Sequence, residues 1–254
     1  MGSGWLGFHV AKDLINTGYR VKLSTRTPSR LAEITALQAD PYLVDISKID
    51  DSIQKFLNSD ILIINIPSKS SADYTELLTH IEKSSVSRVL YISTTSVYPC
   101  ANALVTENDT SDVVGAAMSP YLIIENLISG SEFFESTCIR FGGLIGYDRN
   151  PINFFKNKPI PDPESYVNLI HRDDCIGIIH QVIQQSAWGN TFNACADSHP
   201  TKREFYTAVT QRAGMTLPEF EETKIAPYKI VSNERVKAVL NYSFIYSDIL
   251  NSVE

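Results

Sequence analysis

The sequence has few cysteines, no long hydrophobic run and no excess of positive charge. Its four cysteines lie far apart and form no paired ligand motif, so we expect neither a disulfide framework nor a metal site. No apolar run reaches the ~18 residues that a membrane-spanning helix needs. The net charge of −7 gives no reason to expect binding to nucleic acid or to an anionic membrane. We therefore expect a cytoplasmic protein that binds neither, and we leave a homodimer open.

The sequence also lacks an apolar strand ahead of its first glycine-rich turn, because only Met1 precedes Gly2. In a doubly wound sheet, such a turn follows a central strand with neighbours on both sides. Either the chain starts late, or the sheet has a gap where its first central strand is missing or truncated. We favour the late start, because a gap would leave two rows of backbone groups unpaired.

The turn itself has the sequence GSGWLG and opens a predicted helix. Gly2 permits a tight turn, Gly4 lets a pyrophosphate approach the backbone, and Gly7 lets the helix pack closely on a strand. The helical spacing of the apolar residues that follow predicts a helix that ends near Gly18. The start of this helix would offer free N–H groups to a phosphate.

Strand-like and helix-like segments alternate after this helix. We expect strands at 19–24, 41–46, 60–67 and 88–94, and helices at 28–37, 48–57 and 72–83. This alternation is typical of a parallel sheet covered on both faces. Ligands bind such sheets at the carboxyl ends of the strands. That rule places the following residues around one crevice: Thr25, Arg26, Asp45, Ile46, Ile66, Pro67, Thr94 and Thr95.

The second half of the chain is less regular. We expect a loop at 142–163, a strand at 166–170, a helix at 174–185, a strand at 190–195 and a helix at 202–213 capped by Thr201. A short helix and a closing strand are expected within 232–246. We interpret the chain as one domain, 1–254, with a small substrate lobe drawn mainly from 142–172 and 195–254.

Several motifs in this order carry a family resemblance: the GSGWLG turn, VDI, ISTTSVYP, RFGGLIG, NLIHRDD and SNERV. The chain resembles the extended short-chain dehydrogenase/reductase superfamily of the epimerase/dehydratase type, in its atypical YeeZ-like branch. The resemblance implies an α/β, Rossmann-like fold that binds NAD(P). It also implies oxidoreductase or epimerase chemistry on a small polar substrate, which can be sugar-like.

The resemblance also assigns individual residues. Asp45 and Ile46 match the pair that contacts the adenine, and Ile66 and Pro67 match the strand end against the adenine ribose. Trp5 and Leu6 belong to the fingerprint, and Trp5 either covers the pyrophosphate loop or packs locally. Thr94 and Tyr121 match the catalytic hydroxyl and the catalytic tyrosine.

One position departs from the family, because Glu125 stands where the catalytic lysine belongs. A carboxylate there would raise the pKa of the phenol, which is the opposite of what proton transfer needs. Glu125 can also be an ordinary helix residue, with Tyr121 a core or pocket aromatic. The alternative function is therefore a catalytically weak or inactive dinucleotide-binding sensor or regulatory protein.

The end of the second strand bears on the choice of cofactor. Thr25 and Arg26 lie where an NAD-dependent enzyme would place an acidic residue, and Arg30 follows one helical turn later. Arginine accommodates a 2′-phosphate, so we favour NADP over NAD; the alternative is that both arginines are simply solvated. His171, Arg172, Asp173 and Asp174 can be a metal or acid–base cluster. We favour a structural role for this segment, as a strand-to-helix junction in which an aspartate caps or braces the second lobe.

Overall fold

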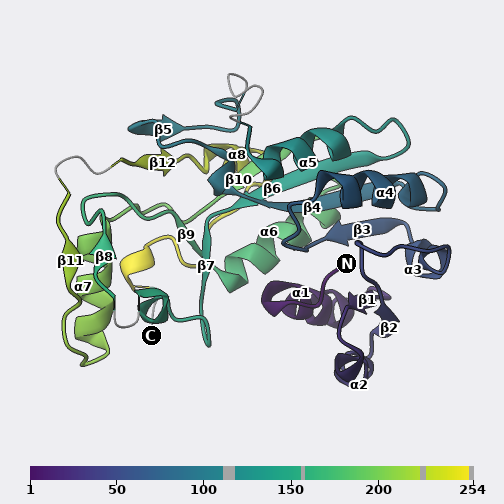
Figure 1. Cartoon of the computed structure of the whole chain (residues 1–254), viewed down its shortest axis with the longest axis horizontal. Helices are drawn as coiled ribbons and strands as arrows, with labels where there is room; N and C mark the ends of the chain where they lie inside the picture. Colours follow the sequence, from purple (N-terminus) through teal and green to yellow (C-terminus); the bar gives the residue numbers. More distant parts are fainter. Residues whose placement is uncertain (111–117, 156–157, 224–226, 252–254) are drawn as a thin grey trace. The chain divides into compact units, whose positions relative to one another are not determined.

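The computed structural model describes residues 1–110, 118–155, 158–223 and 227–251 (Figure 1). The chain divides into two compact units. The first unit contains Met1–Ser93, Gly115–Ile139 and Ile179–Thr191. The second unit contains Thr94–Val114, Arg140–Ile178 and Phe192–Glu254, and so holds both ranges expected to form the lobe.

The first helix of the first unit, α1, spans Trp5–Asn16 and buries Leu6, Val10 and Leu14 on one face, as their spacing predicts. Gly18 ends it with a φ of 95°. The N–H of Gly18 donates to Ile15, and the N–H of Tyr19 donates to Leu14. These bonds satisfy carbonyls at the helix end, and only glycine takes this left-handed conformation at little cost.

Helices and strands alternate along the rest of the first unit. They are β1 (Lys22–Thr25), η1 (Pro28–Arg30), α2 (Leu31–Ala36), β2 (Asp40–Leu43), α3 (Ile53–Leu57), β3 (Ile61–Ile64), α4 (Ser71–Ile81), β4 (Arg88–Thr94) and α5 (Pro120–Ser129). The helix expected at 48–57 is therefore limited to its last turns. Residues 45–52 instead form turns in which Asp45 and Asp50 accept hydrogen bonds from the N–H groups of Ser47 and Ser52, so these side chains compete with the helix.

The strands of this region belong to separate parallel sheets. β1 pairs with β2 in a two-stranded sheet. β3 pairs with β4 in a four-stranded sheet of order β10-β6-β4-β3, which also contains β6 (Glu135–Phe141) and β10 (Thr191–Ala194). The parallel pairing that the sequence predicts is confirmed.

Residues 1–3 lie between β1 and β3. The N–H of Asn65 donates to the Met1 carbonyl over 3.0 Å, and the N–H of Ser3 donates to the Ser24 carbonyl over 3.0 Å. The Met1 ammonium donates to the Ile63 carbonyl. In Figure 1 the N-terminus accordingly lies beside β1 and β3.

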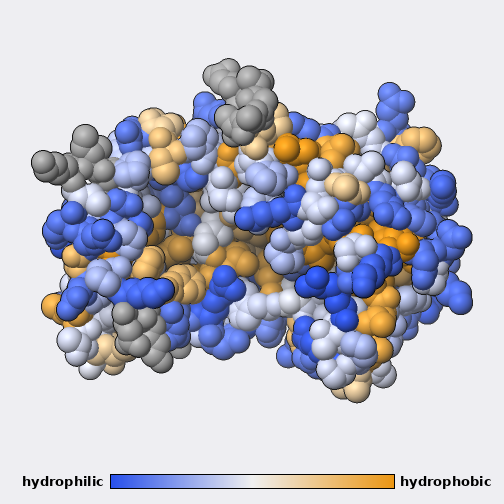
Figure 2. Space-filling view, in the orientation of Figure 1, coloured by the Kyte–Doolittle hydropathy of each residue, from blue (hydrophilic) through white to orange (hydrophobic). Residues whose placement is uncertain are grey.

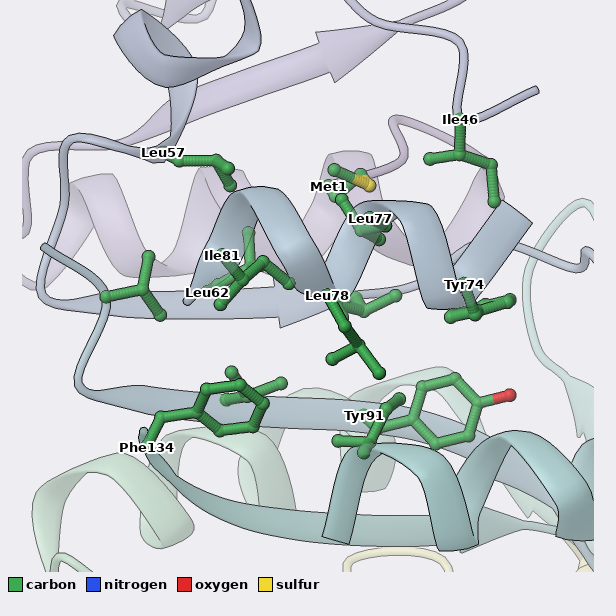
Figure 3. Close-up of a cluster of buried hydrophobic side chains, with 14 of the residues drawn as sticks. Met1, Ile46, Leu57, Leu62, Tyr74, Leu77, Leu78, Ile81, Tyr91 and Phe134 are labelled. Carbon is green, nitrogen blue, oxygen red and sulfur yellow. The ribbon is translucent and has the colours of Figure 1, made fainter. Parts of the chain in front are cut away.

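The largest core cluster of the first unit packs around β3, β4 and α4. Leu62, Leu77 and Tyr91 are at most 3% exposed, and the Met1 side chain joins them (Figure 3). Tyr74 and Tyr91 meet edge to face, with ring centroids 5.9 Å apart. The Met1 side chain is therefore part of the core.

The second unit is built from short parallel strand pairs and helices. Its elements are β5 (Ala103–Val105), β7 (Gly143–Ile145), η4 (Pro151–Phe155), β8 (Ile160–Pro161), β9 (Leu169–His171), α7 (Lys202–Arg212), β11 (Phe220–Glu221), β12 (Lys229–Val231), α8 (Glu234–Leu240) and η5 (Ile249–Asn251). The strands pair as β5 with β12, β7 with β9, and β8 with β11. Helix α6 (Arg172–Gln184) contains residues of both units.

Two predictions for the second unit have opposite outcomes. Thr201 caps α7 as predicted, in a capping box with Glu204. The closing strand expected before Tyr246 is wrong, because residues 241–248 form no strand. The N–H groups of Ile245 and Tyr246 instead donate to the buried carboxylate of Asp174, which takes the place of a partner strand.

The surface of the described residues is mainly hydrophilic. Figure 2 shows hydrophobic residues that reach the surface in places. Exposed large hydrophobic residues include Leu43 in β2, Leu104 in β5 and Phe154 in η4. Within the described ranges, no helix is both long and apolar enough to cross a bilayer.

Candidate functional site: a dinucleotide half-site in the first unit

The glycine turn has the conformation and the close packing that its sequence predicts. Gly2 has a φ of 94°, and a Cβ there would meet the Asn65 carbonyl and the Ile66 side chain. A Cβ on Gly7 would lie 2.9 Å from the side-chain nitrogen Nδ2 of Asn65 and closer still to the Gly2 carbonyl oxygen. A Cβ added to Gly4, by contrast, would have no heavy atom within 4 Å apart from its chain neighbours and the backbone of its own helix. Gly2 and Gly7 are thus required by packing, and Gly4 leaves open space.

The start of α1 suits an anion. Gly4 is its N-cap and provides no side-chain cap, and the first turn contains no acidic residue. The start of a helix presents backbone N–H groups and the positive end of the helix dipole, and a phosphate binds well to both. The N–H of Gly2 donates to the Ser24 hydroxyl over 3.1 Å, which holds the turn against the end of β1. Leu6 is buried beneath the turn, and Trp5 is half-buried.

The predicted residues at the ends of β1 and β2 lie near one another. Thr25 is buried, and its hydroxyl accepts a hydrogen bond from the N–H of Thr27. Arg26 is exposed, and its charge acts on the carboxylate of Asp45. Hydrogen bonds from Ser47 are the main cause that lowers the pKa of Asp45, and Arg26 adds to the effect. Ile46 is buried in the core cluster next to them.

The end of β3 completes this group. Asn65 and Ile66 touch the glycine turn, and the Tyr74 hydroxyl donates to the Ile66 carbonyl over 3.3 Å. Pro67 follows and is exposed. The structure thus brings together the glycine turn and the carboxyl ends of β1, β2 and β3. An open helix start next to the carboxyl ends of three strands is the arrangement at which parallel sheets bind phosphate-containing ligands.

The two arginines expected at the cofactor site differ in their surroundings. The Arg30 guanidinium donates to the Ser3 carbonyl over 2.5 Å and pairs with Glu33 at 2.9 Å. It also lies over the Phe8 ring at 5.9 Å. Arg30 therefore braces the glycine turn, whereas Arg26 is exposed at the end of β1.

The candidate catalytic residues lie in different units. Thr94 belongs to the second unit, where its hydroxyl accepts from the N–H of Ser96 and caps η2 (Thr95–Val97). Tyr121 belongs to the first unit, in the first turn of α5, and is half-buried. The Lys69 ammonium lies 5.4 Å from the centroid of the Tyr121 ring.

Glu125 points toward β4. Its carboxylate is buried and accepts a hydrogen bond from the Ser93 hydroxyl over 2.5 Å. Glu125 therefore has a structural contact of its own, as the ordinary helix interpretation predicts. Lys69, from the segment after β3, is a cation next to Tyr121 that the sequence pattern did not indicate.

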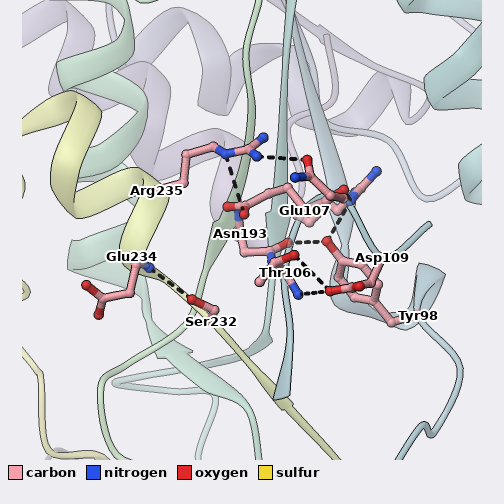
Figure 4. Close-up of polar contacts among 10 residues, drawn as sticks. Tyr98, Thr106, Glu107, Asp109, Asn193, Ser232, Glu234 and Arg235 are labelled. Carbon is pink, nitrogen blue, oxygen red and sulfur yellow. Dashed lines mark hydrogen bonds and ion pairs between the residues drawn. The ribbon is translucent and has the colours of Figure 1, made fainter. Parts of the chain in front are cut away.

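Tyr98, Glu107 and Asn193 belong to a buried polar network in the second unit (Figure 4). The Tyr98 hydroxyl donates to Asn193 over 2.7 Å and accepts from Arg140 over 2.6 Å. Burial raises the pKa of Tyr98 to about 12. Glu107 accepts from the N–H of Asn193 and lies 3.6 Å from Arg235. Most of these buried polar atoms have a partner within the network, but the side-chain amide nitrogen of Asn193 has none among the described residues.

The segment around His171 is a strand-to-helix junction, as expected. β9 ends at His171, and α6 begins at Arg172. The Asp174 carboxylate is fully buried and accepts from the Tyr242 hydroxyl as well as from two backbone N–H groups. Burial raises the pKa of Asp174. Among the residues that the structure describes, no group of His, Cys, Asp and Glu could hold a metal ion.

Comparison with known proteins finds a matching family and a relative along nearly the whole chain. Residues 2–183 match the model of a family described as NAD(P)H-binding. Protein YeeZ of Escherichia coli K12 is 27% identical over 263 residues, which cover 98% of this chain and 96% of YeeZ.

Solved structures share the fold. A functionally unknown conserved protein from Silicibacter pomeroyi matches with a TM-score of 0.82 at 21% identity, covering 99% of this chain and 94% of that one. UDP-glucuronic acid 4-epimerase from Bacillus cereus, in complex with NAD, matches with a TM-score of 0.76 at 19% identity and the same coverage of 99% and 94%. The predicted Rossmann-like α/β fold is therefore confirmed.

Sequence reasoning missed three residues that shape this half-site. Ser24 holds the Gly2 N–H, Asn65 packs against both Gly2 and Gly7, and Lys69 lies over Tyr121. Ser24 and Asn65 directly precede predicted site residues, so their position at strand ends was the available signal. Lys69 had none, because its contact joins segments far apart in the sequence.

Proposed function

We propose that this chain, which belongs to the NAD(P)H-binding family, is an NAD(P)-dependent oxidoreductase or epimerase that acts on a small, sugar-like substrate. The arrangement of the glycine turn, the uncapped start of α1 and the ends of β1, β2 and β3 carries the proposal. The structurally similar epimerase is named for a UDP-sugar acid, which supports a sugar-like substrate.

The cofactor would lie across the first unit. Gly4 and the first turn of α1 would hold the pyrophosphate, Asp45 and Ile46 would contact the adenine, and Ile66 and Pro67 would lie against its ribose. The nicotinamide would supply hydride transfer. The open space beside Gly4 is the cradle that this assignment needs.

NADP is proposed as the preferred cofactor, and Arg26 as the residue that selects it. Arg26 is exposed at the end of β1, where a 2′-phosphate would lie. Arg30 is held by Ser3 and Glu33, so its proposed part is to brace the turn. Arg26→Gln should weaken NADPH binding about tenfold or more and leave NADH binding unchanged.

Fluorescence titration with both cofactors tests this assignment. The matched control is Arg30→Gln, which should weaken both cofactors together because it loosens the turn. Equal affinity of the unaltered protein for NADPH and NADH would refute the proposed preference for NADP.

For the chemistry, we propose Tyr121 as the proton donor and acceptor and Thr94 as the hydroxyl that orients the substrate. Lys69 supplies a positive charge at the Tyr121 ring, although Glu125 replaces the lysine of the family pattern. Tyr121→Phe removes only the hydroxyl, so it should lower turnover about 10²–10⁴-fold without changing cofactor affinity.

The assay for this step would follow NAD(P)H absorbance, and products, over a panel of UDP-sugars and free sugars. Unchanged turnover in Tyr121→Phe would remove Tyr121 from the chemistry. The second candidate is a dinucleotide-binding sensor, because Glu125 stands where the family pattern has its lysine. Tight cofactor binding with no turnover on any panel member would support that candidate.

A further inference from the structure

The ring of Tyr121 is in contact with a positive charge from a distant segment of the chain. The Lys69 ammonium lies over this ring, 5.4 Å from its centroid. Lys69 belongs to the segment between β3 and α4, whereas Tyr121 belongs to the first turn of α5. Both residues are part of the first compact unit. Tyr121 is half-buried, so the cation contacts a ring that a ligand can still reach.

The segment that carries Lys69 is held at both of its ends. At its start, the Tyr74 hydroxyl donates to the Ile66 carbonyl over 3.3 Å. At its end, the Ser70 hydroxyl accepts from the N–H of Asp73 over 3.2 Å and so caps α4. A short segment that is fixed at both ends has few other conformations available. The backbone of Lys69, one residue before the cap, is therefore held in place.

No carboxylate offsets the charge of Lys69 by direct contact. Within the described ranges its ammonium makes no hydrogen bond and no ion pair, and the Tyr121 ring is the contact that it does make. Arg30 of the same unit, by contrast, pairs with Glu33 at 2.9 Å. Lys69 is exposed, so solvent and salt screen part of its charge. The remaining charge acts on Tyr121.

The negative charge of Glu125 is directed to another neighbour. Its buried carboxylate accepts a hydrogen bond from the Ser93 hydroxyl in β4. Burial is the main cause that raises the pKa of Tyr91, also in β4, and the charge of Glu125 adds to the effect. On the side of α4, burial raises the pKa of Tyr74, and Tyr121 and Asp73 add to the effect. Tyr74 therefore stays protonated next to Tyr121.

A cation at this distance favours one form of Tyr121. To accept a proton from a substrate hydroxyl, the tyrosine has to be in its phenolate form. An opposite charge within about 4–6 Å shifts an ionisation equilibrium toward the charged form by about tenfold or more. The face of an aromatic ring also attracts a cation while the phenol is neutral. Lys69 can therefore remain in contact with Tyr121 before and after the proton moves.

We propose that Lys69 stabilises the phenolate of Tyr121, in the place of the lysine that the family pattern has at position 125. This inference rests on the proposed role of Tyr121 as proton donor and acceptor. Lys69 is a positioning residue in this assignment, because it acts through Tyr121 and touches no reacting atom. The chain thus keeps a pair of tyrosine and lysine, with the lysine supplied by the segment after β3 and not by α5.

Nitration by tetranitromethane tests this charge effect without cofactor or substrate, because the reagent attacks phenolates and leaves neutral phenols intact. Mass spectrometry of the full chain after digestion quantifies nitration of Tyr121 at about pH 8, with the exposed Tyr19 as internal reference. Lys69→Met keeps the aliphatic stem but removes the charge, so it should slow nitration of Tyr121 about fivefold or more. Lys69→Arg keeps the charge and should restore the rate to within about twofold. The matched control is Lys83→Met, at an exposed lysine just after the other end of α4, which should leave the rate unchanged.

Two further measurements separate the charge from a structural effect. In 1 M NaCl the difference between the unaltered protein and Lys69→Met should shrink, because salt screens an exposed charge. In turnover assays, Lys69→Met should need a pH about one unit higher to reach half of its maximal kcat, with KM for the cofactor unchanged.

The proposal is overturned if Lys69→Met nitrates Tyr121 at the unaltered rate, or if Lys69→Arg is as slow as Lys69→Met. It is also overturned if Lys83→Met slows nitration equally, because the effect would then not come from the contact with the ring. A Glu125→Gln protein that speeds nitration as much as Lys69→Met slows it would show that Glu125 governs Tyr121 instead. Nitration needs no turnover, so this inference and the proposed function can fail independently.

Discussion

Exchanging Gly7 for alanine sets two physical effects against each other. Alanine is favoured over glycine in a helix by up to about 1 kcal/mol, so propensity alone predicts a more stable protein. The added Cβ would lie 2.9 Å from the side-chain nitrogen Nδ2 of Asn65 and closer still to the Gly2 carbonyl oxygen. The Gly2 backbone cannot easily move, because Ser24 and the neighbours of Gly2 hold it on both sides.

Packing should outweigh propensity at this position. The close contact with a backbone oxygen puts the overpacking cost at the upper end of its usual range, about 2–3 kcal/mol, which leaves a net loss of about 1–2 kcal/mol after a helix gain of about 1 kcal/mol. In a chain of this size, that loss lowers Tm by about 2–8 °C. Cofactor affinity should fall as well, because the displaced turn no longer presents its N–H groups to a phosphate.

The control is Gly4→Ala in the same turn. Gly4 has an extended backbone with a φ of −64°, and no atom lies within 4 Å of its added Cβ. Its stability should change by less than about 1 kcal/mol, whereas NADPH affinity should fall about tenfold or more. Thermal melts and fluorescence titration measure both effects. A Gly7→Ala protein that melts at or above the unaltered Tm would refute the packing argument.

Two further predictions concern buried charges. The folded pKa of the Met1 ammonium, about 5, lies below its value of 8.0 in the unfolded chain. The unfolded state therefore binds more protons between pH 5 and 8, and stability should rise across that window by on the order of 4 kcal/mol. Urea titrations at several pH values should show this rise in the free energy of unfolding. The rise should vanish after acetylation of the Met1 amino group, and a rise that persists in the acetylated protein would contradict the prediction. Asp174→Ala leaves the Tyr242 hydroxyl and two N–H groups without their acceptor. This exchange should lower the free energy of unfolding, measured in the same way, by roughly 2–4 kcal/mol. Asp173→Ala should lower it clearly less, and equal losses in the two variants would contradict the bracing role of Asp174.

The sequence predicts the elements of the first unit well, because its patterns are local. The apolar run at 88–94 becomes β4 with the expected bounds, and Gly18 ends α1 as expected. The failures occur where side chains replace backbone partners. Asp45 and Asp50 hold turns where a helix was predicted, and Asp174 binds the segment at 245–246 where a strand was predicted. Periodicity carries no information on side-chain hydrogen bonds to the backbone, whether they are local, as at Asp45 and Asp50, or long-range, as at Asp174.

The grouping of the candidate cofactor residues is predictable for a related reason, since a glycine turn and strand ends meet by topology alone. The partners of single charged side chains are not. Position in the sequence places Arg26 and Arg30 one turn apart as equivalent candidates, but Arg30 finds the Ser3 carbonyl and Glu33. Glu125 likewise departs from the family pattern by its position in the sequence. In the structure, however, its carboxylate accepts a hydrogen bond from the Ser93 hydroxyl, and Lys69 provides a cation near Tyr121. A long side chain reaches whichever partner lies within a few ångströms, and that choice depends on packing between segments far apart in the chain. The chemistry of Tyr121 therefore has to be judged from its spatial neighbours, and an unexpected residue four positions later does not by itself make the site inactive.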